Sequence, residues 1–90
     1  MQERELEITN EKGLHLRAAS ELVKLTSSLP CKISLSNGVI EVDGKSILGV
    51  AALGAARGSK ILVRTTGEGE ESSMEKIDDL FKRGFYENAP

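Results

Sequence analysis

Stretches with an apolar residue at every second position alternate along this chain with stretches whose apolar residues follow helical spacing. Two-residue alternation indicates a half-buried strand, and apolar residues three and four positions apart indicate an amphipathic helix. Strands are expected at residues 5–9, 32–36, 39–42 and 60–65. Helices are expected at about residues 16–28, 47–53 and 70–83. The predicted order is therefore β-α-β-β-α-β-α.

This order predicts an α+β fold, an antiparallel sheet whose helices pack on one face, because each element must bury one apolar side. Asn37 and Gly38 separate the second and third strands, a pair typical of a two-residue hairpin turn in which both residues take positive φ. With 90 residues, the chain is expected to form a single small domain over residues 1–90 with a thin core.

Composition argues against several classes of function. A net charge of −2 and an aromatic content of 3%, with no Trp, do not suit a nucleic-acid-binding protein. No apolar run approaches the roughly 20 residues that cross a bilayer, and residues 1–5 do not resemble a signal peptide, so we expect a cytoplasmic protein without membrane insertion. One cysteine, Cys31, and one histidine make a metal site unfavourable, and no cofactor is expected.

His15 is the only histidine, and it lies in or next to the N-cap position of the first predicted helix. The unpaired backbone N–H groups of Leu16 and Arg17 should point toward its ring, where the helix dipole is positive and phosphate binds readily. The ring should then be neutral and nucleophilic, and the Arg17 guanidinium could neutralise oxyanions. The alternative is an ordinary solvated capping residue.

The small size of the chain decides which chemistry His15 could perform. A thin core cannot easily enclose a pocket of several hundred Å³ around a small molecule, so an exposed nucleophile would be presented to the active site of another protein. A phosphoryl group on imidazole has a good leaving group and can be passed onward. These features favour a phosphoryl carrier over an enzyme with its own substrate.

A second candidate site surrounds Ser46, which is expected to cap the second helix with its hydroxyl and to be open to regulatory phosphorylation. Ile47, Leu48 and Leu53 cannot all face inward from one short helix. Of these, Leu48 is expected to be exposed and available to partners.

These motifs together resemble the HPr family, the histidine-containing phosphocarriers of the bacterial phosphoenolpyruvate:sugar phosphotransferase system. The resemblance rests on Gly-Leu-His-Leu-Arg-Ala-Ala at residues 13–19, Lys-Ser-Ile-Leu-Gly-Val at 45–50 and Leu-Gly-Ala-Ala-Arg-Gly at 53–58. It implies a monomeric open-faced β-sandwich, with four antiparallel strands and three helices on one side. One departure is Ala18, which stands where the family usually has proline and should make this helix start slightly less rigid.

The resemblance also implies a role for each candidate residue. His15 would be phosphorylated on Nδ1 by enzyme I, which takes the group from phosphoenolpyruvate, and would pass it to a IIA-type protein. Arg17 would stabilise the phosphate, and Ser46 matches the position modified by HPr kinase/phosphorylase. The partner-binding surface would comprise Leu16, Ser20, Lys24, Ile47, Leu48 and Gly49.

Three other interpretations stay open. Within the family, the chain could serve a nitrogen-type regulatory relay, in which the phosphate is a signal and no sugar is moved. A ferredoxin-like domain that senses a small molecule at a dimer interface shares the order β-α-β-β-α-β and would not need His15. A structural interaction module would use His15 only as a helix cap.

Overall fold

The computed structural model describes residues 1–87; residues 88–90, the end of the expected 1–90 domain, lie outside the described residues. The elements are β1 (Gln2–Glu7), α1 (Leu16–Thr26), β2 (Lys32–Ser36), β3 (Glu41–Asp43), α2 (Ile47–Ala52), β4 (Lys60–Thr66), α3 (Glu70–Lys82) and a 3₁₀ turn, η1 (Gly84–Tyr86). This order confirms the predicted strands and helices. Only η1 was not expected.

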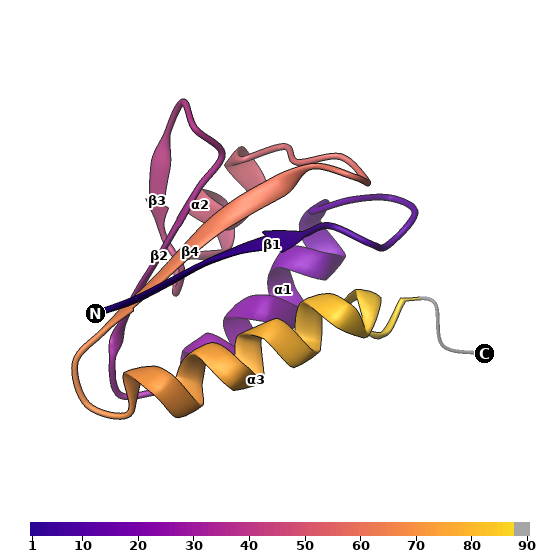
Figure 1. Ribbon diagram of the computed structural model, residues 1–90. Helices are drawn as coiled ribbons and strands as arrows, with labels where there is room; N and C mark the ends of the chain where they lie inside the picture. The colour runs from indigo at the N-terminus through magenta and orange to yellow at the C-terminus, as the bar shows by residue number, and fades with distance from the viewer. Residues whose placement is uncertain (88–90) are drawn as a thin grey trace.

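The strands form one four-stranded sheet in the order β1-β4-β2-β3, and every neighbouring pair is antiparallel. In the central strand β4, Ile61 and Val63 are fully buried, whereas Lys60 and Leu62 are exposed on the other face. The three helices cover the apolar face, and α1 and α3 lie side by side along it (Figure 1). The predicted open-faced α+β arrangement is therefore confirmed.

In the core, α1 packs against α3 and the segment that follows α3. Buried side chains of α1 face those of α3 over the sheet, as the helical spacing predicted. Near the C-terminus, Phe85 is 1% exposed and packs edge-on against Phe81, with ring centroids 4.9 Å apart. The segment after α3 is thereby anchored in the same core that supports the start of α1.

The hairpin between β2 and β3 differs from the prediction. Only Gly38 takes positive φ, at 91°, and β3 begins at Glu41, so the expected two-residue turn and a return strand from Val39 are wrong. The reason is the Asn37 side chain, whose Oδ1 accepts hydrogen bonds from the backbone N–H groups of Val39 and Ile40, at 2.9 Å each. These bonds replace strand pairing and make a longer turn.

Other boundaries shift by a few residues. β1 starts at Gln2, not at residue 5, because it pairs with β4 along its whole length, from Gln2↔Thr65 to Glu7↔Lys60. α1 ends at Thr26, two residues before the predicted end. None of the helices formed by residues 1–87 has both the length and the apolar character that crossing a bilayer requires.

Candidate functional site

His15 is the N-cap residue of α1, as predicted, with an extended backbone at φ −77° and ψ 180°. The preceding loop is fixed against the segment after α2, because the Leu14 N–H donates to the Ala55 carbonyl at 2.8 Å. Gly13 has φ +71°, and a Cβ there would lie 2.3 Å from that same carbonyl oxygen. Only glycine fits such an approach, so this tight contact sets where His15 enters the helix.

The His15 side chain is 33% exposed, contacts the C-terminal segment and makes no hydrogen bond to the helix amides. Its Nε2 lies 2.5 Å from Glu87 Oε2, and Glu87 Oε1 accepts a hydrogen bond from Asn10 Nδ2, also at 2.5 Å. A carboxylate only accepts hydrogen bonds, so the ring proton is assigned to Nε2. Within residues 1–87, Nδ1 has no hydrogen-bond partner.

The first turn of α1 is left without a side-chain cap, since the His15 ring makes no hydrogen bond to it. The first N–H groups of any α-helix have no partner inside the helix, and they carry its positive partial charge. No acidic residue occupies the first turn to compensate it. The first N–H groups of α1 therefore have no side-chain partner, and the predicted approach of the Leu16 and Arg17 N–H groups to the ring is not present as a hydrogen bond.

Arg17 is exposed and forms no ion pair or hydrogen bond with any residue from 1 to 87. With Glu11, Lys12 and Glu87 it lines a shallow depression of about 110 Å³. Metabolite pockets typically measure 300–1,000 Å³, so this depression is too small to enclose a metabolite. Glu87 is the residue that Arg17 and His15 have in common, because it lines the depression with Arg17 and contacts the His15 ring.

Asn10 and Glu87 are the residues that the sequence analysis missed. Glu87 is 72 positions from His15 and lies beyond the last predicted helix, so no local spacing connects the two. Asn10 was assigned only to a loop. In the folded chain it is 0% exposed and joins the loop to Glu87. No sequence signal in a single chain would have identified this pair.

At the second site, Ser46 is the N-cap of α2, and its Oγ accepts a hydrogen bond from the Gly49 N–H at 3.1 Å, as predicted. Leu48 is 80% exposed, whereas Leu53 is 6% exposed and belongs to the core. Ile47 is intermediate between them, at 39%. The expectation that Leu48 is the exposed member of the three is confirmed.

The remaining predicted surface residues are also accessible. Leu16 is 63% exposed, and Ser20 and Lys24 follow it at four-residue intervals, so the three form one exposed stripe along α1. Gly49 is half-buried on α2, which packs against α1. The two packed helices therefore present exposed apolar side chains, of which Leu16 directly follows His15 in the chain.

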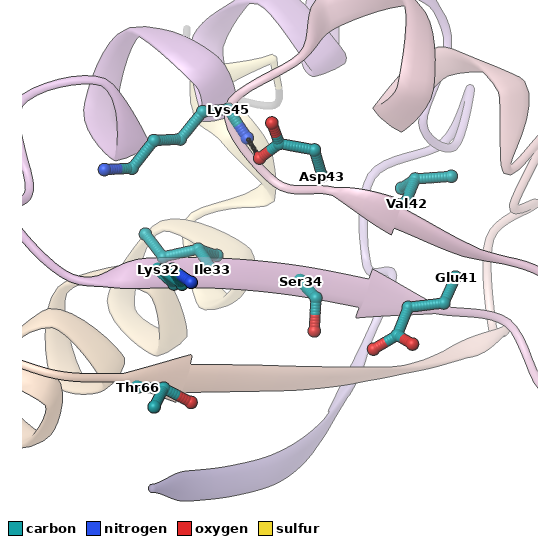
Figure 2. A pocket seen from close by; sticks show the side chains of 8 residues that line it. All are labelled: Lys32, Ile33, Ser34, Glu41, Val42, Asp43, Lys45 and Thr66. Atoms are coloured by element: carbon teal, nitrogen blue, oxygen red, sulfur yellow. Dashed lines mark hydrogen bonds between the residues drawn. The ribbon is translucent and has the colours of Figure 1, made fainter.

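A cavity of about 610 Å³ lies over β2 and β3, and Lys45, the neighbour of Ser46, is one of its lining residues (Figure 2). Its lining mixes both signs of charge, including Lys32, Glu41 and Asp43, and Asp43 Oδ1 accepts a hydrogen bond from the Lys45 N–H. No group of three potential metal ligands occurs within residues 1–87. The cavity adjoins Ser46, whose N–H donates to the carbonyl of the lining residue Asp43 at 3.1 Å, and His15 is not among its lining residues.

A family model described as the PTS HPr component phosphorylation site matches residues 2–83. The chain therefore belongs to the HPr family. The phosphocarrier protein HPr of Xylella fastidiosa (strain Temecula1) is 42% identical, and the alignment covers 98% of this chain and 99% of that protein. The phosphocarrier protein HPr of Pseudomonas putida is 35% identical over 97% of this chain and 98% of its own length.

Solved structures agree with the family assignment. The crystal structure of HPr from Thermoanaerobacter tengcongensis superposes with a TM-score of 0.92 at 32% identity, and covers 98% of this chain and 99% of the other. The chain is thus an HPr phosphocarrier of the phosphotransferase system, a relay protein and not a catalyst. This assignment favours the carrier over the ferredoxin-like sensor.

Proposed function

We propose that His15 accepts a phosphoryl group from enzyme I, which obtains it from phosphoenolpyruvate, and passes it to a IIA-type protein. The observation that carries the proposal is the His15 ring itself. It is partly exposed at the uncapped start of α1, and its Nε2 is engaged by Glu87 while Nδ1 has no partner within residues 1–87. Nδ1 is therefore the nitrogen available to phosphorus.

Transfer is a substitution at phosphorus that needs only the two nitrogens and no cofactor. The Nδ1 lone pair of His15 forms the new P–N bond, and the electron pair of the breaking bond returns to the donor nitrogen of enzyme I. The same exchange, with His15 as the leaving group, delivers the phosphoryl group to the IIA protein. The carrier contributes position and electrostatics, which dominate phosphoryl transfer in general.

Arg17 and the first-turn N–H groups of α1 are proposed to stabilise the phosphoryl oxygens. Arg17 supports this role because it lines the depression beside Glu87 and has no ion-pair partner within residues 1–87. A guanidinium presents several N–H donors in one plane, which suits phosphate oxygens. The helix start adds fixed donors of the same polarity.

Enzyme I and the IIA protein are proposed to dock on the same surface of α1 and α2. It comprises Leu16, Ser20, Lys24, Ile47, Leu48 and Gly49. Leu48 supports this assignment most strongly, because an aliphatic side chain that is 80% exposed contributes nothing to the core. Contiguous exposed apolar side chains next to a reactive group are typical of protein interfaces.

Ser46 is proposed as the site of regulatory phosphorylation by HPr kinase/phosphorylase. Its hydroxyl is half-buried at the start of α2 and already accepts the Gly49 N–H. A phosphate oxygen could accept the same hydrogen bond, so the modification would preserve the helix start while adding charge next to Leu48. We place this chemistry in the cytoplasm, where the buried free thiol of Cys31 is compatible with reducing conditions.

The test is to incubate the purified protein with enzyme I and ³²P-labelled phosphoenolpyruvate. We expect a label that is lost in acid and stable in base, and that is absent from the His15→Ala variant, whose fold is checked by circular dichroism. A folded variant that still became labelled would contradict the role of His15. Presenting IIA proteins of the sugar and nitrogen-type systems as acceptors then decides which branch the carrier serves.

A further inference from the structure

The segment that delivers Glu87 to the His15 ring has an unusual backbone. Gly84, Phe85 and Tyr86 all take left-handed conformations, with φ of 60°, 56° and 65°. For residues with a side chain this conformation costs on the order of 1 kcal/mol or more each. The buried Phe85 ring, packed against Phe81, holds the turn in place. The chain thus sustains local strain immediately before Glu87.

Asn10 fixes the Glu87 carboxylate at a further energetic cost. Its Nδ2 donates to the Gly13 carbonyl at 2.7 Å and to Glu87 Oε1, and both of these neighbours are acceptors, so the orientation of the amide is determined. Its Oδ1 is buried without a hydrogen-bond partner among the described residues. An unsatisfied buried acceptor destabilises a fold. Stability alone therefore does not explain why this network exists.

We propose that Glu87, held by Asn10, is a positioning residue for phosphoryl transfer at His15. This inference rests on the proposed function. Oε2 keeps the ring proton on Nε2, so that the Nδ1 lone pair remains free. When Nδ1 bonds to phosphorus, the ring retains its Nε2 proton and becomes cationic, and the adjacent carboxylate compensates that charge. A carboxylate orients and stabilises a catalytic histidine in the same way in serine proteases.

The negative charge of Glu87 is offset toward an incoming phosphoryl group, because two cationic side chains line the same depression. These side chains are those of Lys12 and Arg17. Glu11 also lines it, but makes no hydrogen bond or ion pair within residues 1–87. Glu11 is therefore a control for charge, an exposed carboxylate that lines the same depression and lacks the ring contact.

The test compares Glu87→Gln with Glu11→Gln in the full-length protein. A glutamine has one acceptor oxygen and cannot accept from both Asn10 Nδ2 and His15 Nε2, so the orienting contact is lost while size is kept. We expect phosphorylation by enzyme I to slow about tenfold in Glu87→Gln and less than twofold in Glu11→Gln. The ¹⁵N shifts of the His15 ring should show a new Nδ1–H tautomer only in Glu87→Gln.

Two further variants distinguish orientation of the His15 ring by Glu87 from a general effect of its negative charge. Glu87→Asp retains both acceptor oxygens and should recover part of the lost rate, and Asn10→Ala should slow transfer in wild-type protein but not in Glu87→Gln. Equal slowing in Glu87→Gln and Glu11→Gln, or wild-type rate and tautomer in Glu87→Gln, would overturn the inference and leave the carrier function standing. A wild-type protein that enzyme I cannot label would instead overturn the proposed function.

Discussion

α1 and α2 begin in the same way and use their first residue differently. His15 and Ser46 are both N-cap residues with an extended backbone. The Ser46 hydroxyl accepts the Gly49 N–H, whereas the His15 ring makes no bond to its helix and turns to Glu87. One helix start is closed by its own side chain, and the other is left open.

This difference separates stability from function. A side-chain cap contributes about 1 kcal/mol, and α1 does without it. What α1 keeps instead is a set of N–H donors that no side chain caps, next to the residue proposed to accept the phosphoryl group. If the start of α2 serves stability and the start of α1 serves function, substitutions at the two should differ in effect. Those at α2 should lower the free energy of unfolding, and those at α1 should lower the rate of phosphorylation.

The largest effect is expected when α1 is given a conventional cap. Asn is among the best N-cap residues, so His15→Asn should gain about 1 kcal/mol at the helix start, which offsets part of the lost Glu87 contact. We expect labelling by enzyme I to be abolished while the free energy of unfolding in urea stays within about 1 kcal/mol of wild type. A variant that behaves like wild type in every assay would make His15 an ordinary cap.

Arg17→Ala tests the open helix start without touching the ring. Arg17 has no ion-pair partner within residues 1–87, so its removal should hardly affect stability. Loss of a charged hydrogen-bond donor to the phosphoryl group should slow transfer by roughly 10–100-fold, about 1.4–3 kcal/mol in the barrier. Rapid-quench measurement of the labelling rate checks this, and unchanged kinetics would remove Arg17 from the mechanism.

Leu48→Asp tests whether enzyme I docks on the exposed surface of α2 when it phosphorylates His15 on α1. The side chain is 80% exposed, so the fold should tolerate the change. A charge in an apolar interface should raise the KM for enzyme I by about tenfold and leave kcat largely unchanged. Val39 is 89% exposed but lies on the β2–β3 hairpin, and Val39→Asp is the matched control. Equal effects of the two variants would argue against a specific docking role for Leu48.

Ser46→Ala should have the opposite effect to His15→Asn, lowering stability and leaving phosphorylation nearly unchanged. Without the hydroxyl, the Gly49 N–H loses its partner, and we expect about 1 kcal/mol of destabilisation in thermal or urea unfolding. The labelling rate at His15 should change less than twofold. Ser46→Asp retains an acceptor at the N-cap and should recover the stability, so a destabilised aspartate variant would contradict the capping explanation.

The sequence predicted well what depends on neighbouring residues. The helical spacing around Leu22 and the capping hydroxyl of Ser46 are local patterns, and the structure confirms both. The turn at Asn37 was predicted wrongly because its side chain competes with backbone pairing, and residue preferences alone do not decide that competition.

The candidate site was predicted only in part for a related reason. His15 and its helix start could be inferred from adjacent residues, but the ring orientation depends on Glu87, at the far end of the chain. That contact requires the Phe81–Phe85 packing and three successive left-handed residues, of which only Gly84 is a residue that favours this conformation. Tertiary packing, not local preference, places Glu87 there.

The start of α3 offers a third arrangement and the smallest expected effect. Its N-cap is Gly69, which has no side chain to cap the helix. The Glu70 carboxylate instead holds the turn before α3 and the N-terminus, with Oε1 accepting the Gly67 N–H at 2.9 Å and Oε2 lying 2.6 Å from the Met1 amine. The amine first, and then the Gly67 N–H, lower the pKa of Glu70 below its ordinary value of 4.5.

Because the pKa of Glu70 is lower in the folded state, its stabilisation is present above pH 4.5 and is lost as the pH falls through the folded-state pKa. Glu70→Gln should therefore melt slightly below wild type at about pH 7 and together with it at about pH 2. Glu71→Gln removes a charge from the same turn without these contacts and is the control. A Glu70→Gln deficit that persisted in acid would show that the carboxylate acts by packing, and the start of α3 would then not be held by charge.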